Sequence, residues 1–153
     1  MKRETAEMRE GGGIGFPEPI SLRIPSRSEY ALIARLVVAQ VGQAAGFGPE
    51  DVYDLKLAVT EAVTNVIRHA AVDSFEIEYR ARSGIVEITV VDAGGGFEAA
   101  DPAPAPGHEG GFGLAVIRSL VDEVVLDSAS GGGTRLRMIR RVSDPAESGE
   151  SQF

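Results

Sequence analysis

The chain has 153 residues, an apolar fraction of 43% and a formal net charge of −8 at pH 7. This length suits one domain with a sizeable core, and the negative charge argues against direct nucleic-acid binding, because phosphate backbones select basic surfaces. No cysteine is present, which excludes disulfides and thiol chemistry. Neither a signal peptide nor a membrane-spanning run is recognisable, so we expect a cytoplasmic protein without membrane contact.

Residues 1–16 are polar and rich in glycine, which predicts a flexible N-terminal arm. Aliphatic and polar residues alternate over residues 20–24, which predicts a short strand that ends at Pro25. A helix follows, with Ser26 or Ser28 as its cap. Its predicted apolar face consists of Tyr30, Ile33, Val37, Val38 and Val41.

A second helix is predicted between Asp51 and Ala70, with Pro49 in its first turn. Its apolar stripe consists of Val52, Leu55, Val59, Ala62, Val63, Val66 and Ala70. An adjoining stripe on one helical face carries Glu61, Asn65, Arg68 and His69. For this helix alone, a solvated polar edge explains that stripe equally well. His69 fits a packing role at the helix end better than the role of a base.

Beyond this helix the apolar period changes to two, which predicts a strand over residues 75–80 and a second over residues 85–92. In the second strand Asp92 has the parity of the aliphatic residues, so its carboxylate is expected to project toward the core. A buried carboxylate needs a specific hydrogen-bond donor. The alternative is an ordinary strand-end aspartate in a turn.

Residues 93–112 are rich in Gly, Pro and Ala and have no apolar period, which is typical of a functional lid or of disorder. A helix over residues 113–121 and strands over residues 124–126 and 134–139 follow. In the last strand Thr134 has the inward parity. Short turns between consecutive strands favour antiparallel hairpins, so we predict an α/β two-layer sandwich with a mostly antiparallel sheet and its helices on one face. The domain is expected to span residues 17–141, before a disordered acidic tail over residues 142–153.

Glycines cluster on both sides of the long connection, at residues 94–96 and at residues 110–113. A glycine-rich entry to a helix exposes backbone N–H groups, which can cradle phosphates. A flexible loop explains these glycines about as well. The Walker A lysine is absent and no strand leads directly into the second cluster, which excludes a P-loop and a Rossmann fingerprint.

Together, these residues suit a purine nucleotide. Asp92 can accept a hydrogen bond from the exocyclic amine of adenine, and Thr134 can reach the same base edge. The amide oxygen of Asn65 is a suitable ligand for a Mg²⁺ ion that bridges phosphates. Glu61 can take a proton from an attacking hydroxyl or water, or position it. Arg68 can neutralise phosphate charge.

Four short segments resemble, in order, the sequence boxes of the GHKL ATPase superfamily, which includes the ATP domains of histidine kinases. They are residues 61–69, 92–97, 111–114 and 133–134. The resemblance covers about residues 50 to 138. It implies the Bergerat ATP-binding fold, with ATP and Mg²⁺ as the bound ligands.

Within this superfamily the chain is most similar to the anti-sigma factor serine kinases of bacterial stress and sporulation switches, because residues 29–36 and 54–62 resemble their first two helices. The resemblance implies that Glu61 is the catalytic base and that Asn65 is the magnesium ligand. It implies an ATP lid over residues 94–113 and a partner-contacting role for Arg35. The residues implied to bind ATP are Asn65, Arg68, Asp92, Gly94, Gly96, Gly111, Phe112, Gly113, Leu114 and Thr134.

The function implied by this resemblance is partner switching. An ATP-bound homodimer would bind a sigma factor, and it would phosphorylate a serine or threonine on a small anti-anti-sigma antagonist. One alternative is a nucleotide-gated anti-sigma protein without kinase activity, against which Glu61 argues, because a binder needs no base. Another is a stand-alone histidine-kinase ATP domain. The proline-rich stretch over residues 101–106 departs from the family pattern.

Overall fold

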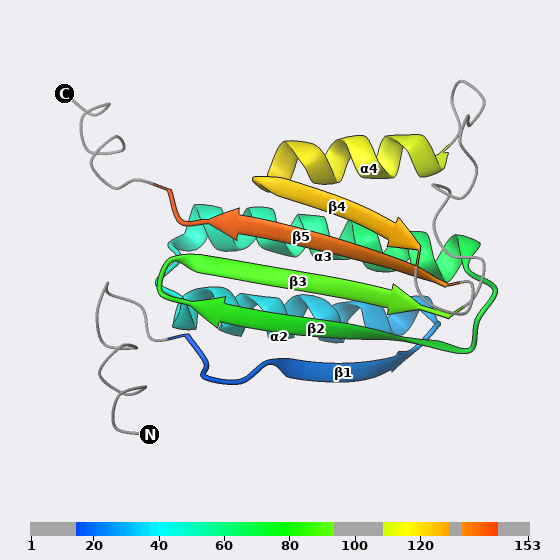
Figure 1. The fold of residues 1–153 in the computed structure, drawn as a ribbon, viewed down its shortest axis with the longest axis horizontal. Coiled ribbons are helices and arrows are strands. Elements are labelled where there is room, and N and C mark those ends of the chain that lie inside the picture. Colours follow the sequence, from blue (N-terminus) through cyan, green and yellow to red (C-terminus); the bar gives the residue numbers. More distant parts are fainter. Residues whose placement is uncertain (1–14, 94–108, 129–132, 144–153) are drawn as a thin grey trace.

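The chain folds into two layers, a five-stranded sheet and a layer of helices behind it (Figure 1). This computed structural model describes residues 15–93, 109–128 and 133–143. The strand order is β1-β2-β3-β5-β4, and all four neighbouring pairs are antiparallel. The predicted α/β two-layer sandwich is therefore confirmed.

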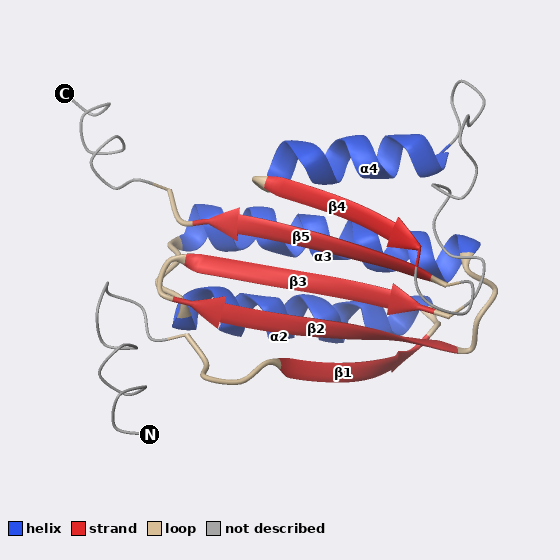
Figure 2. Cartoon of the chain, viewed as in Figure 1, coloured by secondary structure: helices blue, strands red, loops and turns tan. Residues whose placement is uncertain are grey.

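The elements follow the predicted order along the chain (Figure 2). The strands are β1 (Ile20–Pro25), β2 (Ser74–Arg82), β3 (Ile85–Asp92), β4 (Glu123–Ser128) and β5 (Thr134–Arg141). The helices are α2 (Ala31–Ala44), α3 (Pro49–His69) and α4 (Glu109–Leu120), and a short 3₁₀ turn, η1 (Ser28–Tyr30), precedes α2.

The centre of the core is the apolar stripe of α3. All seven residues predicted for this stripe are at most 8% exposed. They belong to one cluster with the inward side chains of the sheet and of α2. Burial of each aliphatic side chain stabilises the fold by roughly 1.5–3 kcal/mol, so packing on the sheet holds the helix that carries Glu61 and Asn65.

The two central strands, β3 and β5, fix the direction of the predicted site residues. Along their pairing, the aliphatic side chains that face α3 are fully buried on both strands. The last pair in this register is Asp92 with Thr134. Because side chains alternate along a strand, these two residues continue the inward face. Asp92 is 1% exposed and Thr134 is 7% exposed, as their parity predicted.

Two details of the first helix differ from the prediction. The turn η1 comes before α2, and the N-cap positions of η1 and α2 are Arg27 and Tyr30, neither with a side-chain capping hydrogen bond, so the predicted caps Ser26 and Ser28 are wrong. The predicted burial of Val38 and Val41 is confirmed, but Ile33 is 44% exposed, and the rest of the buried face consists of the small residues Ala34 and Gly42. The small residues are needed because a Cβ carbon on Gly42 would lie only 3.2 Å from side chains of α3. The apolar period of the sequence alone favours large aliphatic residues for the buried face, not alanine or glycine.

The last helix, α4, begins at Glu109, four residues before its predicted start. Three glycines in its first half made a helix improbable there on propensity alone. At the start of the domain, Gly15 donates a hydrogen bond to Ala44 O, and Phe16 packs against the core. The rest of the predicted arm and most of the acidic tail lie outside the described residues. In the described part of the chain, no helix is long and apolar enough to cross a membrane.

Candidate functional site

The polar stripe of α3 lies along the edge of the buried helix. Asn65 is only 6% exposed, whereas Glu61, one turn earlier, is half-buried. Arg68 is exposed and His69 is half-buried, and both take part in polar interactions. A carboxamide as buried as that of Asn65 is not a solvated surface group. The burial therefore favours a functional interpretation of this stripe.

Gly113, in α4, lies directly against the side chain of Asn65. A Cβ carbon built on this glycine would come within 2.6 Å of Asn65 Nδ2 and 3.1 Å of Oδ1. Any larger residue would therefore displace the carboxamide or push α4 away. The contact brings together two predicted site residues that are 48 positions apart in the sequence.

Asp92 and Thr134 face each other at the ends of β3 and β5. The preceding residue, Gly133, approaches the β3 backbone so closely that a Cβ carbon would lie 2.0 Å from Asp92 O. Of the carboxylate oxygens of Asp92, Oδ2 is buried and receives no hydrogen bond from a described residue. The residue does take part in another polar interaction. A charged group in this position is suited to a ligand that brings a donor.

The described residues include no group of three or more His, Cys, Asp or Glu side chains that could hold a metal ion. The predicted ligand Asn65 nevertheless fits a Mg²⁺ ion that is shared with the phosphates of a nucleotide. Magnesium in nucleotide sites is usually bound through one or two protein oxygens together with substrate phosphates. Asn65 offers one such oxygen, and the site needs no cage of carboxylates.

The other predicted site residues are placed as follows. Gly94 and Gly96 lie outside the described residues, as does most of the predicted lid. Gly111 and Phe112 belong to the first half of α4, and Leu114 is half-buried in the same helix. Arg35 lies on α2, not on the elements that carry the other site residues, and its Nε atom is buried without a hydrogen-bond partner in the described part of the chain.

A shallow hollow of about 550 Å³ lies on the sheet, but it contains no predicted site residue. It is lined by outward-facing residues such as Glu78 on β2, Thr89 on β3 and Arg137 on β5. The charged side chains around it form exposed ion pairs, for example between Arg137 and Glu87 at 3.8 Å. This is the solvated outer face of the sheet, and we assign it no role in nucleotide binding.

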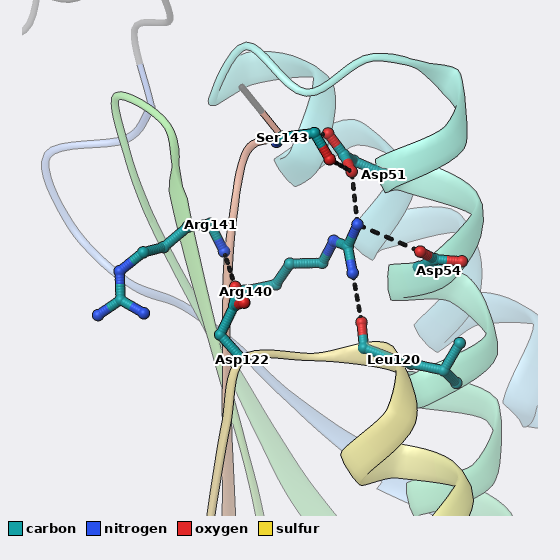
Figure 3. A network of polar contacts seen from close by, with 7 residues as sticks. All are labelled: Asp51, Asp54, Leu120, Asp122, Arg140, Arg141 and Ser143. Carbon is teal, nitrogen blue, oxygen red and sulfur yellow. Dashed lines mark hydrogen bonds and ion pairs between the residues drawn. The ribbon is translucent and has the colours of Figure 1, made fainter. Parts of the chain in front are cut away.

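One polar cluster was missed by the sequence analysis (Figure 3). Arg140, on β5, contacts Asp51 Oδ1 at 2.5 Å and Asp54 Oδ2 at 3.2 Å, and both carboxylates belong to the first turns of α3. It also donates a hydrogen bond to Leu120 O, at the end of α4, at 2.5 Å. Asp51 accepts two further hydrogen bonds from Ser143, one from its N–H and one from its hydroxyl.

A signal for this cluster was present in the sequence. Arg140 has the same parity as Thr134 and the buried residues of β5, so alternation places it on the inward face. An arginine in that position requires a buried acidic partner. In the first turn of a helix, however, an acidic residue such as Asp51 is already explained by the helix dipole, so its position alone does not indicate a distant partner. Burial raises the pKa of Asp51, but the hydrogen bonds from Ser143 N–H, Arg140 and the Ser143 hydroxyl, with the charge of Arg140, outweigh burial and hold this pKa below its ordinary value.

Comparison with known proteins agrees with this geometry. The sequence model of the family described as Histidine kinase-like ATPase domain matches residues 24–140. A protein of Bacillus velezensis named Serine-protein kinase RsbW is 37% identical over 127 residues, which cover 73% of this chain and 79% of that protein. Proteins of the same name from Oceanobacillus iheyensis and Bacillus subtilis are 35% and 34% identical, over 73% of this chain and 80% and 79% of their own lengths.

A solved structure shares the fold. It contains the RsbU and RsbW domains of Rv1364c from Mycobacterium tuberculosis, and it matches with a TM-score of 0.63 at 21% identity. The match covers 84% of this chain and 33% of that one. The family match extends over most of the described fold and includes α3, β3, α4 and β5, which carry Asn65, Asp92, Gly113 and Thr134. The chain therefore belongs to the family of histidine kinase-like ATPase domains, and its relatives there include serine-protein kinases named RsbW.

Proposed function

We propose that this protein is an ATP-dependent serine-protein kinase and anti-sigma factor that acts by partner switching. The observation that carries the proposal is the contact between Asn65 and Gly113, since it brings the predicted magnesium ligand and the glycine-rich start of a helix together. Phosphate oxygens bind well at a helix start with exposed N–H groups. The relatives named serine-protein kinase support the reaction class.

Each site residue has one task in this proposal. Asp92 accepts a hydrogen bond from the exocyclic amine of adenine, and Thr134, its pairing partner, contacts the same base edge. Guanine has a carbonyl at that position, so the carboxylate selects adenine. Asn65 supplies an oxygen to Mg²⁺, which when bound would offset the phosphate charge. Arg68 adds a positive charge at the exposed end of the stripe.

Glu61 acts on the acceptor hydroxyl. It lies one helical turn before Asn65 and is half-buried, so its carboxylate can approach a substrate at the end of the phosphate chain. In the transfer, the serine oxygen of the acceptor protein attacks the γ-phosphorus of ATP and the bond to ADP breaks. Glu61 takes the hydroxyl proton. The products are ADP and a phosphoserine protein.

Partner binding is proposed for the outer surface of α2. Arg35 is accompanied there by three exposed apolar side chains, and Leu32, Ile33 and Leu36 are 54%, 44% and 56% exposed. Large aliphatic residues exposed within two turns of one helix are typical of a surface that binds another protein. We assign this surface to a sigma factor, and we expect the kinase to be a cytoplasmic homodimer. Light scattering of the purified protein would measure the dimer.

The test is a capture and transfer experiment. The tagged protein is isolated from its own cells with Mg-ATP, and the bound proteins are identified and assayed for phosphotransfer. Recovery of a sigma factor, together with an antagonist that becomes phosphorylated on serine or threonine, supports the proposal. Transfer only to histidine, or recovery of a response regulator alone, would overturn it in favour of a histidine-kinase ATP domain. Sigma-factor binding without any transfer would identify a binding protein.

A further inference from the structure

Arg140 ties α3 and α4 together at the end of the sheet that is remote from the candidate site. It pairs with Val86 in the β3–β5 register, six residues from Asp92. Six residues of strand correspond to about 20 Å, so Arg140 cannot touch a nucleotide held near Asp92. Its effect on such a ligand must pass through the two helices that it contacts.

The contacts of Arg140 are specific and partly buried. The side chain is 15% exposed, and its guanidinium contacts Asp51 and Asp54 through Nη2 and Leu120 O through Nη1. The carbonyl of Leu120 belongs to the last turn of α4, where helix geometry provides no intrahelical donor, and Arg140 supplies the hydrogen bond instead. A positive charge at this end also suits the helix dipole. One side chain therefore binds the start of α3 and the end of α4.

In its first half, α4 meets α3 through Gly113 and Asn65. The helix is thus held at Gly113 and at its C-terminal end, and the buried Ile117 lies between these two contacts along α4. Four residues separate Gly113 from the buried Ile117, a helix length of about 6 Å. If Leu120 were released, a tilt of about 10° around Ile117 would move Gly113 by about 1 Å, and a misplacement of this size is enough to weaken a catalytic site.

We propose that Arg140 is a positioning residue for Mg-ATP, because it fixes the orientation of α4 on α3 and so the distance between Gly113 and Asn65. The inference rests on the proposed function, since it assigns the ligand of that site. It adds a residue that no motif of the ATP-binding boxes contains. A purely structural role would change stability alone, whereas a positioning role changes nucleotide binding beyond the change in stability.

The experiment compares three variants of the full-length protein. Arg140→Met removes the guanidinium but keeps an apolar stem. Arg141→Met removes the neighbouring, exposed arginine, which pairs with Glu123 at 3.0 Å. Tyr79→Phe removes a buried hydrogen bond to Ala34 O at 3.0 Å, so it lowers stability at a place remote from α4. Calorimetry gives the Kd of ATP with and without Mg²⁺, and urea unfolding gives the stability of each variant.

Arg140→Met is expected to raise the Kd of Mg-ATP on the order of tenfold, with a smaller effect on ATP without Mg²⁺, because Asn65 is the ligand displaced. The two control variants are expected to bind like the wild type. Equal affinity of Arg140→Met and the wild type would overturn the inference, as would an equal loss in Tyr79→Phe. If Arg140→Met does not fold, Asp54→Asn, which leaves the contact with Asp51, is expected to shift the Kd in the same direction, and an unchanged Kd would overturn the inference.

A wild-type protein that binds no ATP would overturn the proposed function, and the positioning role with it. Amide hydrogen exchange separates the two failures. If Arg140 holds α4, the amides of residues 114–121 exchange faster in Arg140→Met than in Arg141→Met, whether or not ATP binds. Binding of ATP to the wild type together with equal exchange in the two variants would instead overturn the inference alone.

Discussion

Gly113 and Asn65 are in contact, and only the absence of a side chain on Gly113 permits it, since a Cβ carbon would lie 2.6 Å from Asn65 Nδ2. Gly113→Ala should therefore displace the carboxamide and weaken Mg-ATP binding on the order of tenfold, the cost of a small misplacement. Calorimetric titration with Mg-ATP measures the Kd of the variant and of the wild type. Gly48→Ala is the control, because no atom lies within 4 Å of the added carbon. Identical Kd values for the two variants would show that the contact has no role in binding.

Gly133→Ala should act on the sheet and not on α4. Its added carbon would lie 2.0 Å from Asp92 O, a backbone atom that cannot move aside without separating β5 from β3. We expect a loss of about 2 kcal/mol in the free energy of unfolding, in the range of overpacked sites. Urea denaturation measures this loss, again with Gly48→Ala as the control. Wild-type stability would mean that the strand ends can separate without cost.

Asp92→Asn should weaken ATP binding and reduce the preference for ATP over GTP. A hydrogen bond to a charged acceptor contributes about 1.5–3 kcal/mol, so loss of the charge should raise the Kd of ATP on the order of tenfold. Competition between ATP and GTP measures the preference. Asp127→Asn, an exposed aspartate on β4, is the control. An unchanged preference would remove Asp92 from its role as the adenine reader.

Glu61→Ala should abolish phosphotransfer and spare ATP binding, because in the proposed mechanism the carboxylate acts on the acceptor hydroxyl and not on the nucleotide. Loss of a general base typically costs about 10²–10⁴ in rate. The phosphoserine formed on the captured antagonist and the Kd of ATP are measured on the same preparation. Glu50→Ala, at the exposed start of α3, is the control. A normal transfer rate in Glu61→Ala would assign the base to another residue.

The ion pair of Asp51 predicts a dependence of stability on pH. The pKa of Asp51 in the folded protein lies below the ordinary value of 3.8. The ionised carboxylate therefore stabilises the fold above that value, and this contribution is lost as the pH falls through the folded pKa. Asp51→Ala should cost about 3 kcal/mol near neutral pH, because it leaves Arg140 with fewer partners. The difference in the free energy of unfolding between Asp51→Ala and the wild type should shrink in acid. Urea unfolding near neutral pH and at a pH below the folded pKa of Asp51 would measure this. A difference independent of pH would contradict this.

The long helix and the inward strand positions could be predicted because each follows from a local period. The burial of Val59 and Val63 in α3 follows from helical spacing, and that of Asp92 and Thr134 follows from alternation. Contacts between elements could not be predicted in this way. Arg140 and Asp51 are 89 residues apart, and no period of the sequence links them.

The exposed face of α2 shows a second limit. Pattern reading turned Ile33 toward the core because it is large and aliphatic, but close packing of α2 on α3 requires small residues at the contact. Ile33 lies outside this contact, while the smaller aliphatic residues Val38 and Val41 are buried. The start of α4 was missed for a similar reason, since its glycines are poor helix formers. In both places tertiary packing outweighs local preference, and both places belong to the surfaces that we propose for function.

The pairing of Asp92 with Thr134 is a matter of strand register as much as of residue identity. If β5 slipped by one residue against β3, every side chain of β5 would change faces, and the exposed Arg135 would take the place of Thr134 beside Asp92. The base recognition that we propose would then be lost although no residue of the site had been replaced. A one-residue insertion or deletion within β5 should therefore be as harmful as a substitution in the site itself.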